Sequence, residues 1–334
     1  MNTAEVLMKP VHISPRRMCH ANLFVASVQR SLKFYNEICG LQIVLEQPRI
    51  QAGFLSNGNT HHDLGMLQTT KEEVLGENGH RILANKQGAE PGLYHLGWEM
   101  ESEFELVKAY QRALDAGYRI HRTVRHRASH SIYLFDPDGN IHEFYADVDK
   151  VWRGLYNSLT TVSGQWEPDL ASASTDPRYH ADPPIMRVEE APVHPTRFSH
   201  AVLLARNFQN VQRFYSNILG LHEVHRSEDE SLVAYGTPAG AYPVTVAIVD
   251  AAADGKDGRK ALHHFSFQME SADGVNQAEA ALRQRDINVE RSIDSPSKRS
   301  IFIRDPDNNL VEFCNAKPGW SAAPALSATR VFEI

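Results

Sequence analysis

The chain has 334 residues, a length that allows two domains with sizeable cores, and its net charge of −7 at pH 7 excludes a broad basic surface for nucleic acid or an anionic membrane. The three cysteines, Cys19, Cys39 and Cys314, are too few and too scattered for a disulfide framework or a thiolate zinc site, so we expect a reducing, cytoplasmic location. Residues 1–17 lack the apolar core of a signal peptide, and no apolar run is long enough to predict a membrane span. The expected partner is a small molecule, and the 17 histidines direct attention to metal binding.

An internal repeat is the first feature along the chain. Residues 19–41, CHANLFVASVQRSLKFYNEICGL, recur 180 positions later as residues 199–221, SHAVLLARNFQNVQRFYSNILGL. Each copy predicts an alternating strand, then a helix with apolar residues at helical spacing. Each copy ends at a glycine, Gly40 or Gly220, which suits the left-handed end of a helix.

A second pair of copies follows in the same order. Residues 93–100, LYHLGWEM, recur as residues 262–269, LHHFSFQM. Amphipathic helices are expected next, over residues 103–116 and 272–285, and each is followed by a hairpin with an Asp-Pro-Asp turn, IYLFDPDGNIHEFY or IFIRDPDNNLVEFC. The chain is therefore predicted to have an α+β fold of four βαβββ modules in two tandem halves.

The composition divides the chain into four parts. The predicted first half covers residues 15–149 and the second half residues 197–316. Residues 150–196, rich in Pro, Ser and Asp, are expected to connect the halves, and residues 317–334 form a polar tail rich in Pro and Ala.

The first hairpin contains a carboxylate among apolar residues. Glu143 stands on its second strand between Ile141 and Tyr145, whose side chains share its face because strand side chains alternate with a period of two. A carboxylate among apolar neighbours is costly unless a positive charge meets it. A metal ion is the usual candidate.

The repeat also contains candidate metal ligands in both halves. They are His20, His95 and Glu143 in the first half and His200, His264 and Glu312 in the second. The second histidine and the glutamate are 48 residues apart in each half. One such histidine alone is more often a structural or surface residue than a ligand, but the coincidence in both halves favours a metal.

A four-module chain with histidines on the first strands of two modules and a glutamate on a last strand resembles the vicinal oxygen chelate superfamily. Within it, the chain resembles the type I extradiol catechol dioxygenases, over nearly everything except the connection and the two ends. The resemblance implies that each pair of modules forms an open barrel, with His20, His95 and Glu143 as a facial triad on Fe(II) or, less often, Mn(II). Three open coordination positions would take both oxygens of a catechol and dioxygen.

The resemblance further implies catalytic groups around this metal. His62, in HHDLGM on an expected alternating strand, matches the acid/base histidine of the family, and Tyr133, ten residues before Glu143, matches its active-site tyrosine. His126 matches the other second-sphere histidine, with His130 as a competitor.

Several neighbours have ordinary structural interpretations. His61, Tyr94 and His263 are expected to face away from the ligands, because adjacent strand residues point to opposite faces. Tyr133 could simply be packing material, and the basic residues 121–130 could be a solvated loop or a contact for a substrate carboxylate or for oxygen.

The second half keeps the ligand residues and lacks the rest. Phe302 stands at the position of Tyr133, Ser295 at that of His126, and residues 235–250 contain no histidine. In the family that the chain resembles, the C-terminal half is usually the active one. Here we predict that the first half is active and that the second triad is a vestige or an auxiliary metal site.

The expected function is an Fe(II)-dependent extradiol ring-cleaving dioxygenase that acts on a small aromatic diol and O2. Two alternatives remain open: a glyoxalase-like metal-dependent isomerase or transferase, and a non-catalytic ligand-binding protein of the same fold. A homo-oligomer is expected, because sheet edges that face outward favour association.

Overall fold

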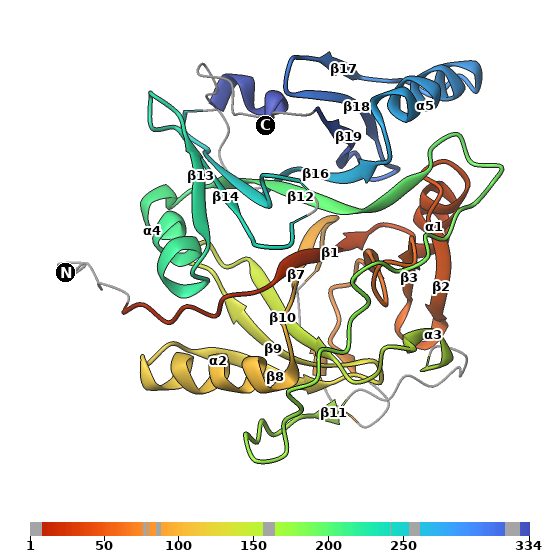
Figure 1. The fold of residues 1–334 in the computed structure, drawn as a ribbon. Helices are drawn as coiled ribbons and strands as arrows, with labels where there is room; N and C mark the ends of the chain where they lie inside the picture. The colour runs from red at the N-terminus through yellow and green to blue at the C-terminus, as the bar shows by residue number, and fades with distance from the viewer. Residues whose placement is uncertain are drawn as a thin grey trace.

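The computed structural model describes residues 9–75, 79, 81–84, 88–155, 164–240, 242–253, 261–317 and 328–334. These residues form two large sheets, the first from the red-to-yellow part of the chain with the short green strand β11 (Gly164–Gln165), and the second from the green-to-blue part (Figure 1). We call each large sheet with its helices a half of the molecule.

Within the described residues, the first sheet has nine strands in the order β11-β8-β9-β10-β7-β1-β4-β3-β2. They are β1 (Arg17–Val25), β2 (Gln42–Gln47), β3 (Ala52–Ser56), β4 (Leu64–Gln68), β7 (Gly92–Glu99), β8 (Ile120–Arg125), β9 (Ser129–Phe135), β10 (Ile141–Asp147) and β11 (Gly164–Gln165). The other elements of this half are α1 (Val28–Glu37), η1 (Pro48–Ile50), α2 (Glu103–Asp115), α3 (Trp152–Leu155) and a separate strand pair, β5 (Val74–Leu75) and β6 (Arg81–Leu83).

The second sheet has eight described strands in the order β13-β14-β15-β12-β16-β19-β18-β17. They are β12 (Pro195–Ala205), β13 (His222–Arg226), β14 (Leu232–Gly236), β15 (Val246–Asp250), β16 (Leu262–Met269), β17 (Arg291–Asp294), β18 (Lys298–Arg304) and β19 (Leu310–Ala316). Its helices are α4 (Phe208–Arg213), which continues into the π-helical turn η2 (Phe214–Ile218), then α5 (Ala272–Gln284) and η3 (Ala328–Glu333).

The pairing of the strands confirms the predicted α+β fold. In each βαβββ module the first strand pairs in parallel with the last: β1 with β4, β7 with β10, β12 with β15, and β16 with β19. Two modules then join through an antiparallel pair of first strands, β1 with β7 or β12 with β16. This arrangement brings the first strands of two modules and a last strand to the centre of each sheet.

The helices begin where the sequence supplies a cap. The side chains of Ser27, Ser102 and Ser271 accept a hydrogen bond from the amide three residues later, at the starts of α1, α2 and α5. α1 then buries Leu32 and Tyr35 on one face, as its apolar spacing predicts. None of the helices in the described part of the chain is long and apolar enough to cross a membrane.

In each half, the turn of the last hairpin forms hydrogen bonds with the other half. Asp138, between β9 and β10, accepts hydrogen bonds from the amides of Arg206 (2.6 Å) and Asn207 (3.0 Å), next to the start of α4. Asp307, between β18 and β19, accepts one from the amide of Ala26 (3.1 Å), next to the start of α1. A carboxylate is favourable beside the unpaired amides of a helix start. These turns therefore connect the two halves of the molecule, in addition to connecting the two strands of each hairpin.

The segment between the halves packs on the first of them. β11 pairs with β8, and the amide of Met186 donates to the carbonyl of Asn57 at 2.6 Å. At the other end of the chain, η3 lies against the second sheet (Figure 1).

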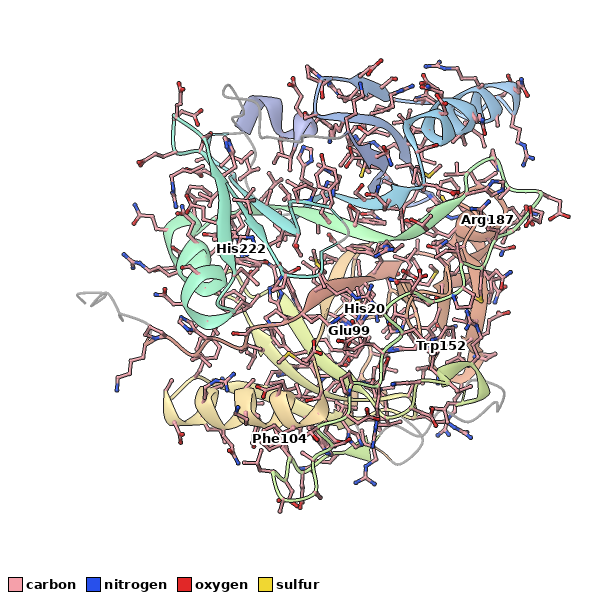
Figure 2. All side chains as sticks on the ribbon, in the orientation of Figure 1. His20, Glu99, Phe104, Trp152, Arg187 and His222 are labelled. Atoms are coloured by element: carbon pink, nitrogen blue, oxygen red, sulfur yellow. The ribbon has the colours of Figure 1, made fainter. Side chains whose placement is uncertain are left out.

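The two faces of the central strands have different surroundings. Ala21 and Leu23 of β1 belong to a large apolar cluster that also contains residues of the second half, such as Phe265. His20 and Asn22, one residue out of step, therefore project from the other face of the sheet. Figure 2 shows His20 and Glu99 deep inside the molecule, where Glu99 accepts hydrogen bonds from Arg17.

Candidate active site

The site of the first half is built on three adjacent central strands, β1, β7 and β10. His20, Gly97 and Glu143 lie at one level across them, because His20 pairs with Gly97 and Gly97 pairs with Glu143. A Cβ atom at Gly97 would lie 2.0 Å from Cε1 and Nε2 of His20. Glycine at this position therefore allows the His20 ring to extend over β7 towards Glu143.

Three donor atoms converge here. Nε2 of His20 lies 3.1 Å and Nε2 of His95 lies 3.0 Å from the same oxygen, Oε2 of Glu143, and all three side chains are buried. The donor atoms lie within 4.8 Å of one another. Nε2 of His95 is buried and has no partner in hydrogen-bond geometry among the described residues. These residues fit a divalent metal ion held by two imidazoles and one carboxylate.

The protonation states of these side chains suit metal binding. Burial lowers the pKa of His20 to about 4, so its imidazole is neutral near pH 7, which is the form that binds metals. Burial alone would raise the pKa of Glu143, but the close contacts of its carboxylate with His20 and His95 hold that pKa well below its ordinary value. The cluster therefore presents two neutral nitrogens and one negative charge.

Two hydroxyl groups hold the other oxygen of Glu143. Ser131 donates to Oε1 at 2.6 Å and Tyr133 donates to it at 2.7 Å. Burial and the nearby Glu143 raise the pKa of Tyr133 well above its ordinary value, so the phenol keeps its proton. Oε1 is thus engaged by donors, and Oε2 is the oxygen that faces the two histidines.

His126, rather than its competitor His130, reaches this network. Nε2 of His126 lies 2.9 Å from the hydroxyl of Tyr133. Because the proton of that hydroxyl is donated to Glu143, its oxygen can accept one from His126. His130 lies 2.7 Å from a carboxylate oxygen of Glu103.

His62 lies in the loop before β4, and not on the strand that its alternating sequence predicted. Its ring is 4.2 Å from that of His20, and its Nε2 lies 3.2 Å from Oδ1 of Asn22. When Nε2 donates its proton to Asn22, Nδ1 carries the lone pair. Burial lowers the pKa of His62 well below its ordinary value, so the ring is neutral and can take up a proton.

Two neighbours that were expected to face away line the same cavity, and those expectations were wrong. Nδ1 of His61 lies 3.0 Å from Oδ1 of Asp147. The alternation rule fails for His61 because it lies with His62 in a loop, where side chains do not follow a period of two. Tyr94 lies at an irregularity in the pairing of β1 with β7, where alternation is interrupted, and its hydroxyl accepts a hydrogen bond of 2.6 Å from Arg122.

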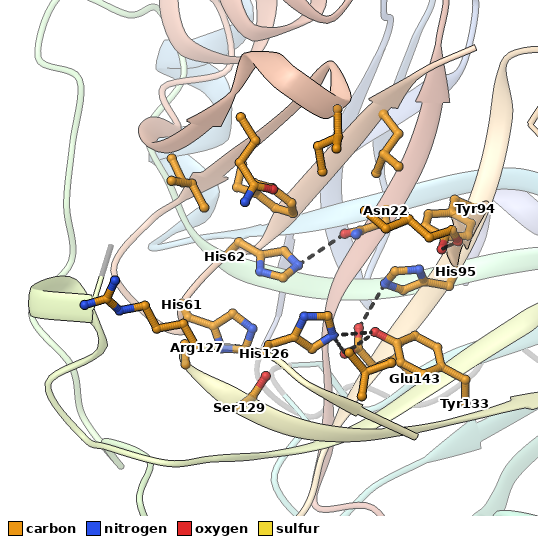
Figure 3. A pocket seen from close by; sticks show the side chains of 18 of the residues that line it. Asn22, His61, His62, Tyr94, His95, His126, Arg127, Ser129, Tyr133 and Glu143 are labelled. Carbon is orange, nitrogen blue, oxygen red and sulfur yellow. Dashed lines mark hydrogen bonds and ion pairs between the residues drawn. The ribbon is translucent and has the colours of Figure 1, made fainter. Parts of the chain in front are cut away.

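These groups surround a cavity of about 110 Å³. Figure 3 shows His62 and Asn22 facing Glu143, Tyr133 and His126 across it. The apolar part of its wall is formed by Leu45, Ile50, Phe54, Leu67, Ile82 and Val124. An apolar cavity of about 150 Å³ holds benzene, so a cavity of this order suits one aromatic ring.

The model of the glyoxalase/bleomycin resistance protein/dioxygenase superfamily matches residues 17–144 and 197–313, which is most of the chain. The chain belongs to this superfamily. The structure thus combines the superfamily fold with a cluster of donor atoms in its first half.

Two curated superfamily relatives are similar to the chain in sequence. Metapyrocatechase 2 of Cupriavidus necator is 27% identical over 166 residues, or 47% of this chain and 46% of the relative. Catechol-2,3-dioxygenase of Bacillus subtilis (strain 168) is 29% identical over 206 residues, or 60% of this chain and 64% of the relative. The match spans less than two thirds of either relative.

A solved structure extends the likeness over almost the whole chain. The 2,3-dioxygenase LapB from Pseudomonas sp. KL28 is 16% identical, with a TM-score of 0.65, and the match covers 96% of this chain and 98% of that one. At this identity the likeness shows a shared fold.

The superfamily repeat brings a second cluster together in the second half, but less closely. Nε2 of His200 lies 3.1 Å from Oε2 of Glu312, whereas Nε2 of His264 lies 3.7 Å from it. The described residues of this half whose donor atoms lie within 4.8 Å of one another are His200, Glu312 and Cys314. His263, expected to face away, instead lies with its Nδ1 2.7 Å from Nδ1 of His264.

Four residues of the first site were not predicted from the sequence: Asn22, Gly97, Ser131 and Arg122. Asn22 and Gly97 carried a usable signal, since the repeat has Val202 and Ser266 at these positions. Arg122, whose guanidinium lies 4.4 Å from the centre of the Tyr133 ring, was hidden within the basic residues 121–130.

Proposed function

We propose that this protein is an extradiol dioxygenase that opens the ring of a catechol-type aromatic with both atoms of O2. Its metal is proposed to be Fe(II), and Mn(II) suits the same ligands. The observation that carries the proposal is the convergence of His20, His95 and Glu143 beside a cavity that also presents His62 and Tyr133. The similarity to two relatives named for catechol cleavage supports it.

The proposed metal ligands are His20, His95 and Glu143. A metal on this triad would supply open positions for both catechol oxygens and for O2, and a route for charge between them. Glu143 neutralises only part of the charge of a divalent ion, so the site would favour a singly deprotonated catechol. Ser131 and Tyr133 hold Glu143 so that it offers one oxygen, which keeps the other positions open.

His62 is the proposed acid/base. Its neutral ring can accept a proton from a catechol hydroxyl and return it later in the reaction. Asn22 orients the ring by accepting a hydrogen bond from Nε2 at 3.2 Å, which leaves Nδ1 as the nitrogen that can accept a proton. Packing against His20 at 4.2 Å keeps His62 next to the proposed metal position.

Tyr133 and His126 are the proposed hydrogen-bonding groups on the opposite wall. Because Tyr133 keeps its proton, its O–H, which donates to Glu143 here, could turn to donate to negative charge that develops on a substrate oxygen. The guanidinium of Arg122 over its ring strengthens that donor. The apolar wall packs on the substrate ring and excludes water from these hydrogen bonds.

Oxygen uptake by anaerobically prepared, Fe(II)-loaded protein with a panel of catechols tests the proposal. The absorbance of the ring-opened product is followed at the same time. Glu143→Gln is expected to reduce turnover by more than the roughly 100-fold that a change in a residue behind the ligands costs. No uptake with any catechol would contradict the proposal; metal-dependent turnover without O2 would favour a glyoxalase-like isomerase, and binding without turnover a ligand-binding protein.

We also propose that the chain forms a homo-oligomer in the cytoplasm. The end strands of the two large sheets, among them β2 and β17, have one neighbour each in the described structure, and a second copy could cover such edges. Light scattering coupled to gel filtration measures the assembly, and a monomer at all concentrations would contradict it.

A further inference from the structure

The glutamate of the second half already has a buried cation as its partner. Nζ of Lys298 donates to Oε1 of Glu312 at 2.7 Å, and both side chains are 0% exposed. The ammonium group also donates to the main-chain oxygen of Ile334 at 2.5 Å. Lys298 engages Oε1 alone, and Oε2 of Glu312 and Nε2 of His200 and of His264 are buried without a partner in hydrogen-bond geometry among the described residues. The buried pair is electrically neutral, so a divalent ion beside it would leave buried positive charge without compensation.

In the described part of the first half, the position that corresponds to Lys298 holds a serine. The pairing places Lys298 opposite Ala316, as it places Ser129 opposite Asp147, so Ser129 holds the corresponding position. The hydroxyl groups that donate to Glu143 are neutral, and no lysine or arginine among the described residues forms an ion pair with it.

The strand that carries the second histidine, β7 in the first half and β16 in the second, differs as well. Ser266 stands where the first half has Gly97, at the level of His200. A Cβ atom at Gly97 would collide with the ring of His20, whereas Nε2 of His200 lies 3.1 Å from Oε2 of Glu312 even though Ser266 stands on the strand between them. The spacing differs at the other histidine, since Nε2 of His264 lies 3.7 Å from Oε2 of Glu312 and Nε2 of His95 lies 3.0 Å from Oε2 of Glu143.

The polar groups behind the metal position are replaced by apolar ones. The amide of Ala21 donates to the carbonyl of Asp63, and the amide of Ala201 donates to the carbonyl of Thr245. Asp63 and Thr245 therefore hold corresponding positions, as do the residues that precede each of them in the sequence. Val244 therefore holds the place of His62. Val202, two positions after His200, likewise holds the place of Asn22, and both valines are buried in one apolar cluster.

The segment that contains η3 completes this cluster. Val331 and Ile334 are buried in it. The ring of Phe332 lies parallel to that of His264, with centroids 6.1 Å apart, and edge-on to that of Phe302 at 5.2 Å. Side chains of η3 therefore occupy the region that would have to hold a substrate.

We propose that the ammonium group of Lys298 takes the place of a metal ion in the second half. Its His200, His264 and Glu312 cluster is a closed, metal-free core, and the chain binds its metal in the first half alone. This inference goes beyond the proposed function, because it concerns the half that the proposed reaction does not use.

Metal content per chain is the first test, measured by mass spectrometry after loading with excess Mn(II) and desalting. Glu312→Gln is expected to bind as much metal as the wild type, and circular dichroism checks that it is folded. Loss of one metal per chain in Glu312→Gln, with none lost in Glu143→Gln, would overturn the proposal. The Glu143→Gln result separately tests the proposed function.

Thermal melting gives a second test that does not need Glu312→Gln to fold. In Glu143→Gln the second half is intact, and Mn(II) is expected to leave its melting temperature unchanged, because a ligand stabilises only a protein that binds it. A rise that disappears in the double variant Glu143→Gln/Glu312→Gln would overturn the proposal. The variant Lys298→Met/Glu312→Gln removes both charges at similar volume, and is expected to keep the wild-type metal content.

Discussion

The two halves share one βαβββ plan and the same three candidate ligands, yet they surround the glutamate differently. Glu143 accepts hydrogen bonds from two hydroxyl groups and borders a cavity. Glu312 instead accepts a hydrogen bond from the ammonium group of Lys298, and the ring of the neighbouring His264 packs against that of Phe332. Two histidines and a glutamate at the right spacing therefore do not make a metal site by themselves. The charge already present and the space left for a ligand decide whether an ion is needed.

The comparison also identifies small residues as important parts of the site. Gly97 allows His20 to approach Glu143, and Ser129 leaves room where the second half has a lysine. Neither residue carries chemistry of its own. Exchanging residues between corresponding positions therefore tests what distinguishes the halves.

The largest effect is expected from Gly97→Ser, which installs the residue of the second half. The new Cβ atom displaces the His20 ring, so metal affinity should fall by at least about 100-fold and turnover should be lost with it. Isothermal titration with Mn(II) measures the affinity. The reciprocal Ser266→Gly is the matched control, with unchanged metal content; equal affinities of Gly97→Ser and the wild type would contradict the role of the glycine.

A smaller effect is expected from His62→Phe. Removing an acid/base group typically slows a reaction by about 10²–10⁴-fold, while the three ligands remain. The variant should therefore keep its metal and lose turnover in oxygen-uptake assays. Val244→Ala, at the corresponding position of the second half, is the control with unchanged turnover. Normal turnover of His62→Phe would show that another group moves the proton.

Tyr133→Phe makes the first half resemble the second, which has Phe302. The one hydrogen-bond donor of Tyr133, which serves Glu143 here and is proposed to serve the substrate, is lost at a cost of about 1–2 kcal/mol, which corresponds to roughly tenfold in turnover. Steady-state kinetics measures this change. Phe302→Tyr should leave turnover unaltered, and an effect of that variant would link the second half to the reaction.

The smallest effect is expected in the pH dependence of the metal-free protein. Burial lowers the pKa of His20 to about 4, while in the unfolded chain it lies at about 6.5, so between these values the unfolded chain binds a proton that the folded chain does not. The free energy of unfolding should therefore fall as the pH decreases, by about 1 kcal/mol from this residue between pH 6.5 and 5.5. Urea unfolding of wild type and His20→Asn measures the difference, and parallel curves would contradict the neutral state of His20.

Much of the site could be predicted from the sequence because its residues recur in a repeat. The ligands His20, His95 and Glu143 lie on regular strands, where spacing translates directly into a shared face. His126 lies in the turn between β8 and β9 and Tyr133 lies within β9, and both were predicted from the family resemblance, with His130 as a competitor of His126. Roles for these residues remain proposals, but their proximity follows from the register of the strands.

The misplaced residues lie where that translation fails. His61 was assigned to the wrong face because the loop before β4 does not alternate. Lys298 was overlooked because a lysine near a strand end normally reaches solvent, and only the surrounding structure shows that it is buried against Glu312. The turn residue Asp138 was correctly expected in a turn, but its contact with α4 depends on how the halves dock.

The sequence by itself determined the repeat, the βαβββ modules and the candidate ligands, because these depend on local periodicity and on residue types that recur at fixed offsets. Only the tertiary structure decided which cluster has a cavity and which has an internal cation. Those properties depend on side chains that are far apart in the sequence, such as Lys298 with Glu312 and Phe332 with His264. Burial turns such contacts into strong electrostatic and packing effects, and burial is a property of the folded chain as a whole.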